Sequence, residues 1–491
     1  MLSFTPSISF MKTFVFHPII SHATPFWLHL CYFLVVSLSG YIALKVTNPR
    51  TTNINGNNTT TKLYNLDLYF TSVSATTNSS MATLEMEVFS NTQLIFMTFL
   101  MLVGGEVFTS MLGLHLRSKT LKKIDNNSIE DDDDDDDTIK CYNKCTKYLG
   151  YVVLGYLIII HTLGSTLVTL YMIMTPSAHN VLKSKGLVLN TFSIFTIVST
   201  FSSCGYLPTN ENMIIFRRNP GLLLIVLPFV FLGNTLYPPM LRVFIWVLER
   251  FTKRTEFSYM LNHNKEIGYC HLFSSKECWC ITATVIAFLG LQVVVFVGME
   301  WRSGVMEGMN SYQKFVGSLF QSANTRHAGE YIVDLSLVSS AVLVLFTLMM
   351  FLPPYTSFIP ISHEQEDAPQ TIIRIKKQKK MRENILFSQL SYLVIFVIVI
   401  CITERKSLTD DPLNFNVLNI VFEVISAYGN VGLSTGYSCK RQLNTDEHCE
   451  DKMYGFCGRW SSAGKCVLIL VMFFGRLKRF NLHGGKAWKM L

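Results

Sequence analysis

The stretch FEVISAYGNVGL (422–433) decides the fold, because three further stretches of the same design occur along the chain. These stretches read FTSVSATTNSSM (70–81), FTIVSTFSSCGY (195–206) and LFQSANTRHAGE (319–330). When the four are aligned without gaps, their eleventh positions are Ser80, Gly205, Gly329 and Gly432. Self-similarity at such long intervals indicates that a whole structural module is repeated four times.

Eight apolar blocks surround these stretches, two for each stretch. A helix that spans about 30 Å of hydrocarbon needs about 20 apolar residues. The blocks that meet or approach this length are 26–46, 91–115, 148–174, 219–247, 279–299, 334–353, 386–403 and 464–480. One polar stretch between two spans would be an ordinary loop. Four in phase predict re-entrant pore loops, because non-helical backbone at membrane depth is tolerated only where it is buried or lines water.

The predicted fold class is therefore an all-α membrane protein with four membrane–pore–membrane repeats around one central pore. It has eight transmembrane helices and four re-entrant pore helices. Basic residues gather in the segments that would share one side of the membrane, and the positive-inside rule makes that side cytoplasmic. The pore modules are then 26–116, 148–247, 277–356 and 386–480. The cytoplasmic segments are the N-terminus 1–25, the acidic loop 117–147, the loop 248–276, the basic loop 357–385 and the tail 481–491.

Composition narrows the function classes. Only 15% of the residues are charged, against about 25% in average soluble domains. The net charge of +8 does not indicate nucleic-acid binding, because the basic residues lie beside the apolar blocks that face the lipid bilayer. A membrane enzyme or receptor is the alternative from another class, but HExxH and a Gly-rich phosphate loop ending in Lys-Ser or Lys-Thr are absent. The sequence predicts no enzyme activity and no cofactor.

The four stretches carry the chemistry of a selectivity filter. Rings of backbone carbonyls replace the hydration shell of an ion, and glycine permits the backbone angles that such a turn needs. We therefore expect a monovalent cation, Na+ in the first instance, to bind at Ser80, Gly205, Gly329 and Gly432. The expected filter neighbours are Thr77, Asn78, Ser79, Ser203, Cys204, His327, Ala328, Asn430 and Val431.

The segments resemble the four filters of the plant high-affinity potassium transporter (HKT) family, within the wider Trk/Ktr/HKT superfamily. Further matching stretches are MEVFSNTQL (86–94), LVGGEVFTSML (102–112), PTNENMIIFR (208–217), GNTLYPP (233–239), LMMFLPPYT (348–356) and NFNVLNIVFEVISAYGNVGLSTGYSC (414–439). The resemblance implies four modules around one pore in one polypeptide. It also implies uptake of monovalent cations, driven by the membrane potential, across the plasma membrane. Relatives with this architecture are often dimers in which each chain holds its own pore.

The first filter divides the family, and Ser80 resembles its sodium-selective class I. A side chain at this position narrows the ring that the four filter positions form, or perturbs one of its carbonyl groups. Either change penalises the larger K+ ion. Asn234 matches the residue found in sodium-selective members. Two neighbours depart from the family pattern, since Asn78 stands where Val is usual and Ser203 where Asn is usual. Potassium transport, or Na+/K+ symport, is therefore the alternative on the same scaffold.

Several charged residues have two interpretations. Arg476 resembles a basic group below the filter that restricts ion passage, and the alternative is a cytoplasmic anchor at the helix end. Glu85 and Glu87 are expected to concentrate cations at the outer mouth, unless they lie on a solvated surface or in ion pairs. Arg326 is expected to hold the third filter in place by hydrogen bonds, because its charge would repel a cation.

Three remaining features concern the loops. The run Asp131–Asp137 is typical of solvated disorder. Asn57 and Asn58 begin glycosylation sequons in an outer loop, whereas the sequon at Asn78 is expected to be inaccessible within the pore. Three cysteines share one polar loop, which allows one disulfide and leaves one thiol; they are Cys439, Cys449 and Cys457.

Overall fold

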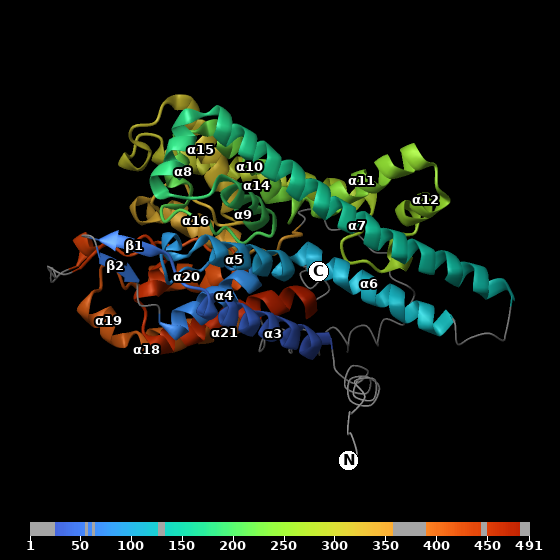
Figure 1. The fold of residues 1–491 in the computed structure, drawn as a ribbon, viewed down its shortest axis with the longest axis horizontal. Helices are drawn as coiled ribbons and strands as arrows, with labels where there is room; N and C mark the ends of the chain where they lie inside the picture. Colours follow the sequence, from blue (N-terminus) through green and yellow to red (C-terminus); the bar gives the residue numbers. More distant parts are fainter. Residues whose placement is uncertain are drawn as a thin grey trace, which may run out of the picture.

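The computed structural model is a bundle of helices elongated along one axis (Figure 1). It describes residues 25–54, 57–60, 64–125, 133–356, 389–442 and 449–481. Within these ranges the regular secondary structure is helical except for one small antiparallel hairpin of β1 (Thr51–Ile54) and β2 (Asn57–Thr60), in which Thr51 pairs with Thr60. We call the end of the bundle that carries this hairpin the hairpin end.

Each of the four modules contains an entering helix, a short pore helix and a leaving helix. Module 1 comprises α3 (Pro25–Val46), α4 (Asn65–Thr77), α5 (Asn91–Gly104) and α6 (Glu106–Asp125). Module 2 comprises α7 (Asp133–Met174), α8 (Pro176–Lys185), α9 (Leu189–Phe201), α10 (Pro220–Leu232) and α11 (Tyr237–Thr252). Module 3 comprises α14 (Ser275–Glu300), α15 (Ser311–Asn324) and α16 (Ser340–Phe351). Module 4 comprises α18 (Gln389–Thr403), α19 (Arg405–Asp410), α20 (Val417–Gly429) and α21 (Ser462–Asn481).

Short elements connect these helices. Two helices, α12 (Thr255–Asn262) and α13 (Asn264–Ile267), lie at the end opposite the hairpin. The 3₁₀ turns are η2 (Met86–Val88), η3 (Asn212–Phe216), η4 (Gly304–Met306), η5 (Leu335–Leu337), η6 (Cys439–Arg441) and η7 (Phe456–Arg459). The four pore helices α4, α9, α15 and α20 coincide with the four repeated stretches, so the sequence located all of them.

The modules pack as a closed ring. The leaving helix of each module lies against the pore helix of the next module: α5 against α9, α10 against α15, α16 against α20, and α21 back against α4. The entering helix of each module packs on its own pore helix, as α3 does on α4 and α14 on α15. Most pore-helix side chains are buried, including Phe70, Phe195 and Phe422 at the first position of their stretches and Phe320 at the second position of the third stretch. The four pore helices therefore surround a common centre.

A polar side chain ties the leaving helix to the entering helix in modules 1, 3 and 4. In module 3 the buried carboxylate of Glu300 accepts the Ser339 N–H at 2.9 Å. In module 4 Glu404 accepts the Ser461 N–H at 3.0 Å. In module 1 the Gln93 amide donates to the Leu44 carbonyl at 2.9 Å. These contacts fix the hairpin ends of the apolar helices, where unsatisfied backbone groups would be costly.

The leaving helices differ from the continuous spans expected from hydropathy. By length and composition, three described helices are able to cross a membrane, or six if each bent pair is one span. The expected block 91–115 breaks at Gly105 with a bend of 58°, and the block 219–247 breaks between α10 and α11 with a bend of 86°. The expectation of one unbroken helix in each block is wrong. Hydropathy does not detect such bends, because glycine inside an apolar run leaves the mean hydropathy high.

The acidic run also needs correction. Its interpretation as solvated disorder is wrong for Asp133–Asp137, which form the first turns of α7. Carboxylates are favourable at this place, because the helix macrodipole puts partial positive charge at the N-terminus. Asp131 and Asp132 lie outside the described residues. So do almost all residues of the expected segments 1–25, 357–385 and 481–491.

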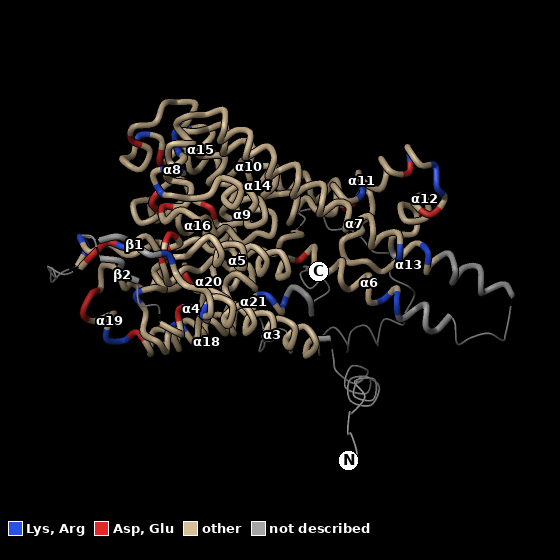
Figure 2. Tube along the Cα trace, in the orientation of Figure 1, with Lys and Arg blue, Asp and Glu red and all other residues tan. Residues whose placement is uncertain are grey.

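Charge is distributed unevenly along the long axis. Figure 2 shows most lysine, arginine and acidic residues toward the hairpin end and toward the end of α12, with few along the helices between them. The helix surfaces between these ends expose large apolar side chains, such as Ile158, Val294 and Ile398. Apolar sides with charged ends are what a lipid bilayer requires of a multi-pass membrane protein.

Candidate ion-binding site

The four pore helices end in related turns at the centre of the bundle. In three modules an N–H bonds to the carbonyl five residues earlier: Ser79 to Ser74 at 2.9 Å, Cys204 to Ser199 at 2.8 Å and Val431 to Ser426 at 3.0 Å. Each bond follows a residue in the left-handed region, and these residues are Asn78 (φ 53°), Ser203 (φ 60°) and Asn430 (φ 50°). In module 3 the corresponding bond comes one residue later, from Gly329 to Asn324 at 3.0 Å.

The expected filter positions are brought together. A Cβ atom added at Gly205 would lie 1.5 Å from the Ala328 carbonyl oxygen of the next module. One added at Gly329 would lie 2.0 Å from the Val431 oxygen, and one at Gly432 would lie 2.2 Å from the Cβ of Ser80. The Tyr206 hydroxyl closes the ring by donating to the Met81 carbonyl, one residue after the filter position in modules 2 and 1. The four turns therefore touch in chain order around one centre.

Ser80 is the exception within this ring. Like the three glycines it has positive φ, 53° against 87°, 68° and 95° for Gly205, Gly329 and Gly432. A left-handed backbone costs a non-glycine residue roughly 1–2 kcal/mol, so Ser80 is strained where the glycines are not. We call the four filter positions Ser80, Gly205, Gly329 and Gly432 the corners of the ring. The side chain of Ser80 is 7% exposed and packs against Gly432, whereas neighbouring atoms leave no room for a side chain at the other three corners.

Hydroxyl and amide groups surround the first and fourth turns. Ser79 Oγ lies 2.8 Å from Thr77 Oγ1 and accepts a hydrogen bond from Asn430 Nδ2 at 2.7 Å. Asn78, as expected, is buried, with 1% of its surface exposed. The left-handed φ of Asn78 suits this residue, since Asn adopts the conformation more readily than a β-branched residue does.

The second and third turns are held by the leaving helix of module 2. Asn234, in the break between α10 and α11, donates from Nδ2 to Ser203 Oγ at 2.9 Å. The hydroxyl of its neighbour Thr235 bonds to Nε2 of His327, and Nδ1 of His327 lies 2.7 Å from the Ala323 oxygen. The two residues expected to modulate and to flank the filter, Asn234 and Ser203, are therefore in direct contact.

Comparison with known proteins agrees with this geometry. Residues 9–482 match the TrkH family, described as cation transport proteins. The chain belongs to this family of cation transporters. It is 50% identical over 495 residues to the cation transporter HKT1;3 of Oryza sativa subsp. japonica, across 95% of this chain and 91% of that protein. It is 48% identical over 471 residues to the sodium transporter HKT1 of Arabidopsis thaliana, across 91% of each.

These relatives confirm the resemblance to the plant HKT family and exclude the enzyme alternative. A solved structure, the potassium transporter TrkH from Vibrio parahaemolyticus, has a TM-score of 0.51 at 14% identity and covers 93% of this chain and 83% of that one. This likeness concerns the fold alone. The described part of this transporter has no cluster of three or more His, Cys, Asp or Glu side chains that would hold a metal.

Two arginines of the transporter are buried near the ring. Arg326 donates to the Pro354 oxygen at 3.3 Å and to Thr356 Oγ1 at 3.2 Å, bonds the Pro353 oxygen, and lies 4.9 Å from the centre of the Phe288 ring. The prediction that hydrogen bonds hold Arg326 is confirmed. Its guanidinium fastens the third turn to the end of α16.

Arg476 of the transporter is 1% exposed, so it is not an exposed anchor at a helix end. Its guanidinium donates to the Gly104 carbonyl, where α5 ends, and lies 5.8 Å from the centre of the Phe33 ring. Arg476 therefore joins modules 4 and 1 beside the break in the first leaving helix.

The acidic residues after the first filter are all engaged. Glu87 pairs with Lys185, which also contacts Glu211 at 2.6 Å. Glu85 accepts the Met453 N–H at 3.2 Å. Glu106 begins α6 at the break in the first leaving helix and lies 3.8 Å from Nε2 of His271. For Glu87 the ion pair was one of the open interpretations, and it is the one that the structure contains.

Sequence reasoning missed a second set of glycines. A Cβ added at Gly104, Gly233 or Gly475 would lie 1.9, 1.8 or 2.1 Å from the carbonyl oxygen of Thr76, Phe201 or Tyr428, respectively. These three oxygens occupy the same repeat position, so each leaving helix touches the end of its own pore helix backbone to backbone. The signal was present as a glycine inside three of the apolar blocks (91–115, 219–247 and 464–480), followed at once by a polar or charged residue or a second glycine: GGE, GNT and GRL.

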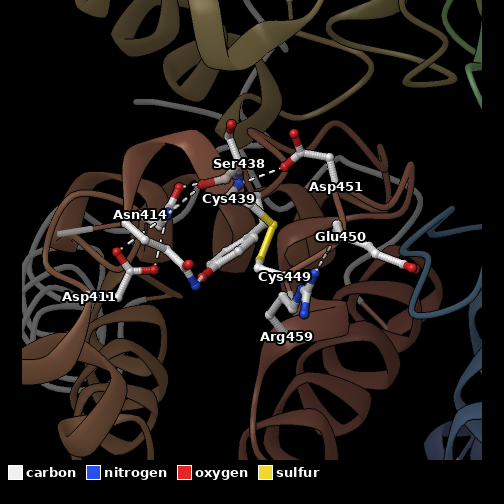
Figure 3. The surroundings of a disulfide bond; sticks show 10 residues. Asp411, Asn414, Ser438, Cys439, Cys449, Glu450, Asp451 and Arg459 are labelled. Carbon is white, nitrogen blue, oxygen red and sulfur yellow. Dashed lines mark hydrogen bonds between the residues drawn. A yellow bond between two sulfur atoms is a disulfide. The ribbon is translucent and has the colours of Figure 1, made fainter. Parts of the chain in front are cut away.

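The loop after the fourth filter contains a disulfide between Cys439 and Cys449, with Cα atoms 5.8 Å apart (Figure 3). Cys457 remains a free, buried thiol, so the expectation of one bridge and one leftover thiol is confirmed. Asn414 donates to Asp411 and to the Ser438 carbonyl beside the bridge. The sequon residues Asn57 and Asn58 lie on β2 at the same end.

Proposed function

We propose that this cation transporter is a sodium-selective, channel-like uniporter that moves Na+ passively down its electrochemical gradient. The observation that carries the proposal is the ring of four touching turns. Among the four filter positions of this ring, only Ser80 has a side chain. The Arabidopsis thaliana relative is named a sodium transporter, and it supports the same choice of ion. Potassium transport, or Na+/K+ symport, is the competing outcome.

In this proposal the backbone oxygens at Ser80, Gly205, Gly329 and Gly432 replace the hydration shell of the ion. The pore helices point their carboxyl ends at the ring, and the partial negative charge there favours a cation. One charge that crosses 100 mV gains about 2.3 kcal/mol. The membrane potential therefore suffices to drive transport, and no nucleotide is required.

Selectivity in this proposal depends on one corner. The Cβ and hydroxyl of Ser80 restrict the ring next to Gly432, which penalises K+ more than the smaller Na+. Asn234 contributes indirectly, because its hydrogen bond holds Ser203 in the second turn. Arg476 restricts ion passage below the ring through its positive charge.

The remaining proposals concern topology and location. The chain would form eight transmembrane spans in four modules, with the bent pairs α5–α6 and α10–α11 each counted as one span. The hairpin end would face outside and α12 the cytoplasm, with basic segments inside by the positive-inside rule. We place the protein in the plasma membrane, and a homodimer would contain one pore in each chain.

Current recordings test the proposal. In a voltage-clamped cell that expresses the full chain, the reversal potential should shift when external Na+ is replaced by an impermeant cation. Replacement of external K+ by an impermeant cation should shift the reversal potential little. Equal shifts with the two ions would favour potassium transport, and a current that requires both ions together would favour symport. Absence of any cation current from protein at the cell surface would refute transport.

A further inference from the structure

The residue after each filter position is buried and lies against the preceding module of the ring. Tyr206 of module 2 donates its hydroxyl to the Met81 carbonyl of module 1. Met81 belongs to the same apolar cluster as Ile420 of module 4, and Leu433 to the same cluster as Phe320 of module 3. These four equivalent residues are Met81, Tyr206, Glu330 and Leu433.

Module 3 alone places a charged residue here. Met81 and Leu433 fill the equivalent space with apolar atoms, so a carboxyl group is not needed for packing. Glu330 is 0% exposed. One of its oxygens bonds the hydroxyl of Thr200, in the pore helix of module 2. The other, Oε2, has no hydrogen-bond partner among the described residues.

Burial with so few partners favours the protonated form of a carboxyl group, so Glu330 is ionised only where a cation compensates its charge. The ion pairs in the described part of the chain do not include Glu330. The neighbouring Arg326 is turned toward the end of α16. What lies beside Glu330 is the ring itself, since Gly329 precedes it and a Cβ added at Gly205 would lie 3.4 Å from its backbone nitrogen.

We propose that Glu330 supplies the negative charge that strengthens cation binding in the filter, from behind the ring between modules 2 and 3. The inference rests on the proposed ion-conducting function of the ring. Glu330 acts through its field on the ion, while Thr200 holds its carboxylate in place. The charge raises cation affinity, whereas Ser80 selects ions by size at another corner.

Three variants separate charge from structure. Glu330→Gln removes the charge but keeps an oxygen that accepts from Thr200. Thr200→Val removes the hydroxyl but keeps the carboxylate. Glu300→Gln is the control, because Glu300 is also a buried carboxylate of module 3 but accepts the Ser339 N–H at the helix end. The current is measured against external Na+ concentration for each, with surface expression quantified.

A unit charge about 10 Å from an ion changes the affinity by on the order of tenfold at an effective dielectric constant of about 20. Glu330→Gln should therefore raise the half-saturating Na+ concentration by about tenfold, with a maximal current per surface molecule near wild type. Thr200→Val and Glu300→Gln should change it much less. If Glu330→Gln leaves half-saturation unchanged, or Thr200→Val impairs it equally, the charge has no such role. Loss of current in the wild type itself would instead refute the proposed function.

Discussion

The first and third corners of the ring are built on related left-handed turns, yet they offer different chemistry. Ser80 keeps a side chain against Gly432, and its surroundings are the neutral groups of Ser79 and Asn430. Gly329 has no side chain and is followed by a buried carboxylate, Glu330. Module 3 thus has a carboxyl group beside the ring, whereas module 1 has a side chain within it.

The comparison teaches that one repeated backbone turn is used for separate tasks. In the proposed function, four copies supply the ligand ring, and departures from the repeat at single positions supply selectivity and charge. Because the corners touch through backbone atoms, a side chain is tolerated only where the neighbour leaves room for it. A side chain can be placed at another corner, a contact that supports the ring can be removed, or the loop outside the ring can be altered.

The largest effect is expected when the serine is moved to the third corner. In Gly329→Ser the new Cβ would lie 2.0 Å from the Val431 oxygen, a contact that forces the ring to shift. We expect the Na+ current per surface molecule to fall by at least about tenfold, since a cost of about 1.4 kcal/mol already gives that factor. The current is measured under voltage clamp and normalised to surface protein.

Gly290→Ser is the matched control for this variant. Gly290 lies in α14 with no atom within 4 Å of an added Cβ, outside its own helix backbone, so its current should stay near wild type. Wild-type current in Gly329→Ser would mean that the first corner is not special in accepting a side chain.

A smaller effect is expected from the contact between Asn234 and Ser203. Asn234→Ala removes a buried hydrogen bond, which contributes about 1 kcal/mol, and should reduce the preference for Na+ over K+ by severalfold. Ser203→Ala should act similarly. Because both remove the same bond, the double variant should be little worse than either single variant. Additive effects on the reversal potential would show that Asn234 acts by another route.

The smallest effect on ion selectivity is expected at the disulfide, which lies in the loop beyond the fourth filter. Cys439→Ser combined with Cys449→Ser should lower the melting temperature of the purified protein, since closing a short loop stabilises by about 2–3 kcal/mol. The reversal potentials should stay at wild-type values, because the bridge contacts no ring residue among those described. A shift in selectivity would tie this loop to the filter and weaken the separation of tasks.

Much of this architecture was predictable because the repeat is in the sequence. The phase of Ser80, Gly205, Gly329 and Gly432 located all four pore helices and the turns that meet. The bends at Gly105 and after Gly233 were missed, because hydropathy averages over a window and does not report direction. The helical start of α7 was missed because an acidic run has low intrinsic order until a helix N-terminus stabilises it.

Individual side chains were harder to assign, because their partners lie in other modules. The Arg476 contact with Gly104 joins residues from the two ends of the chain, and spacing does not predict such a contact. Glu330 was overlooked for the same reason, since its partner Thr200 lies in another module. Asn234 and Ser203 were each identified, but only the folded chain shows that they touch.

The central claim is that one side chain, at the first corner, sets the choice between Na+ and K+. Ser80→Gly tests it most directly, with reversal potentials recorded under bi-ionic Na+ and K+ conditions. The account predicts a functional protein in which K+ permeability relative to Na+ rises by about tenfold, equivalent to about 1.4 kcal/mol. Reversal potentials identical to those of the wild type, with robust current, would contradict it.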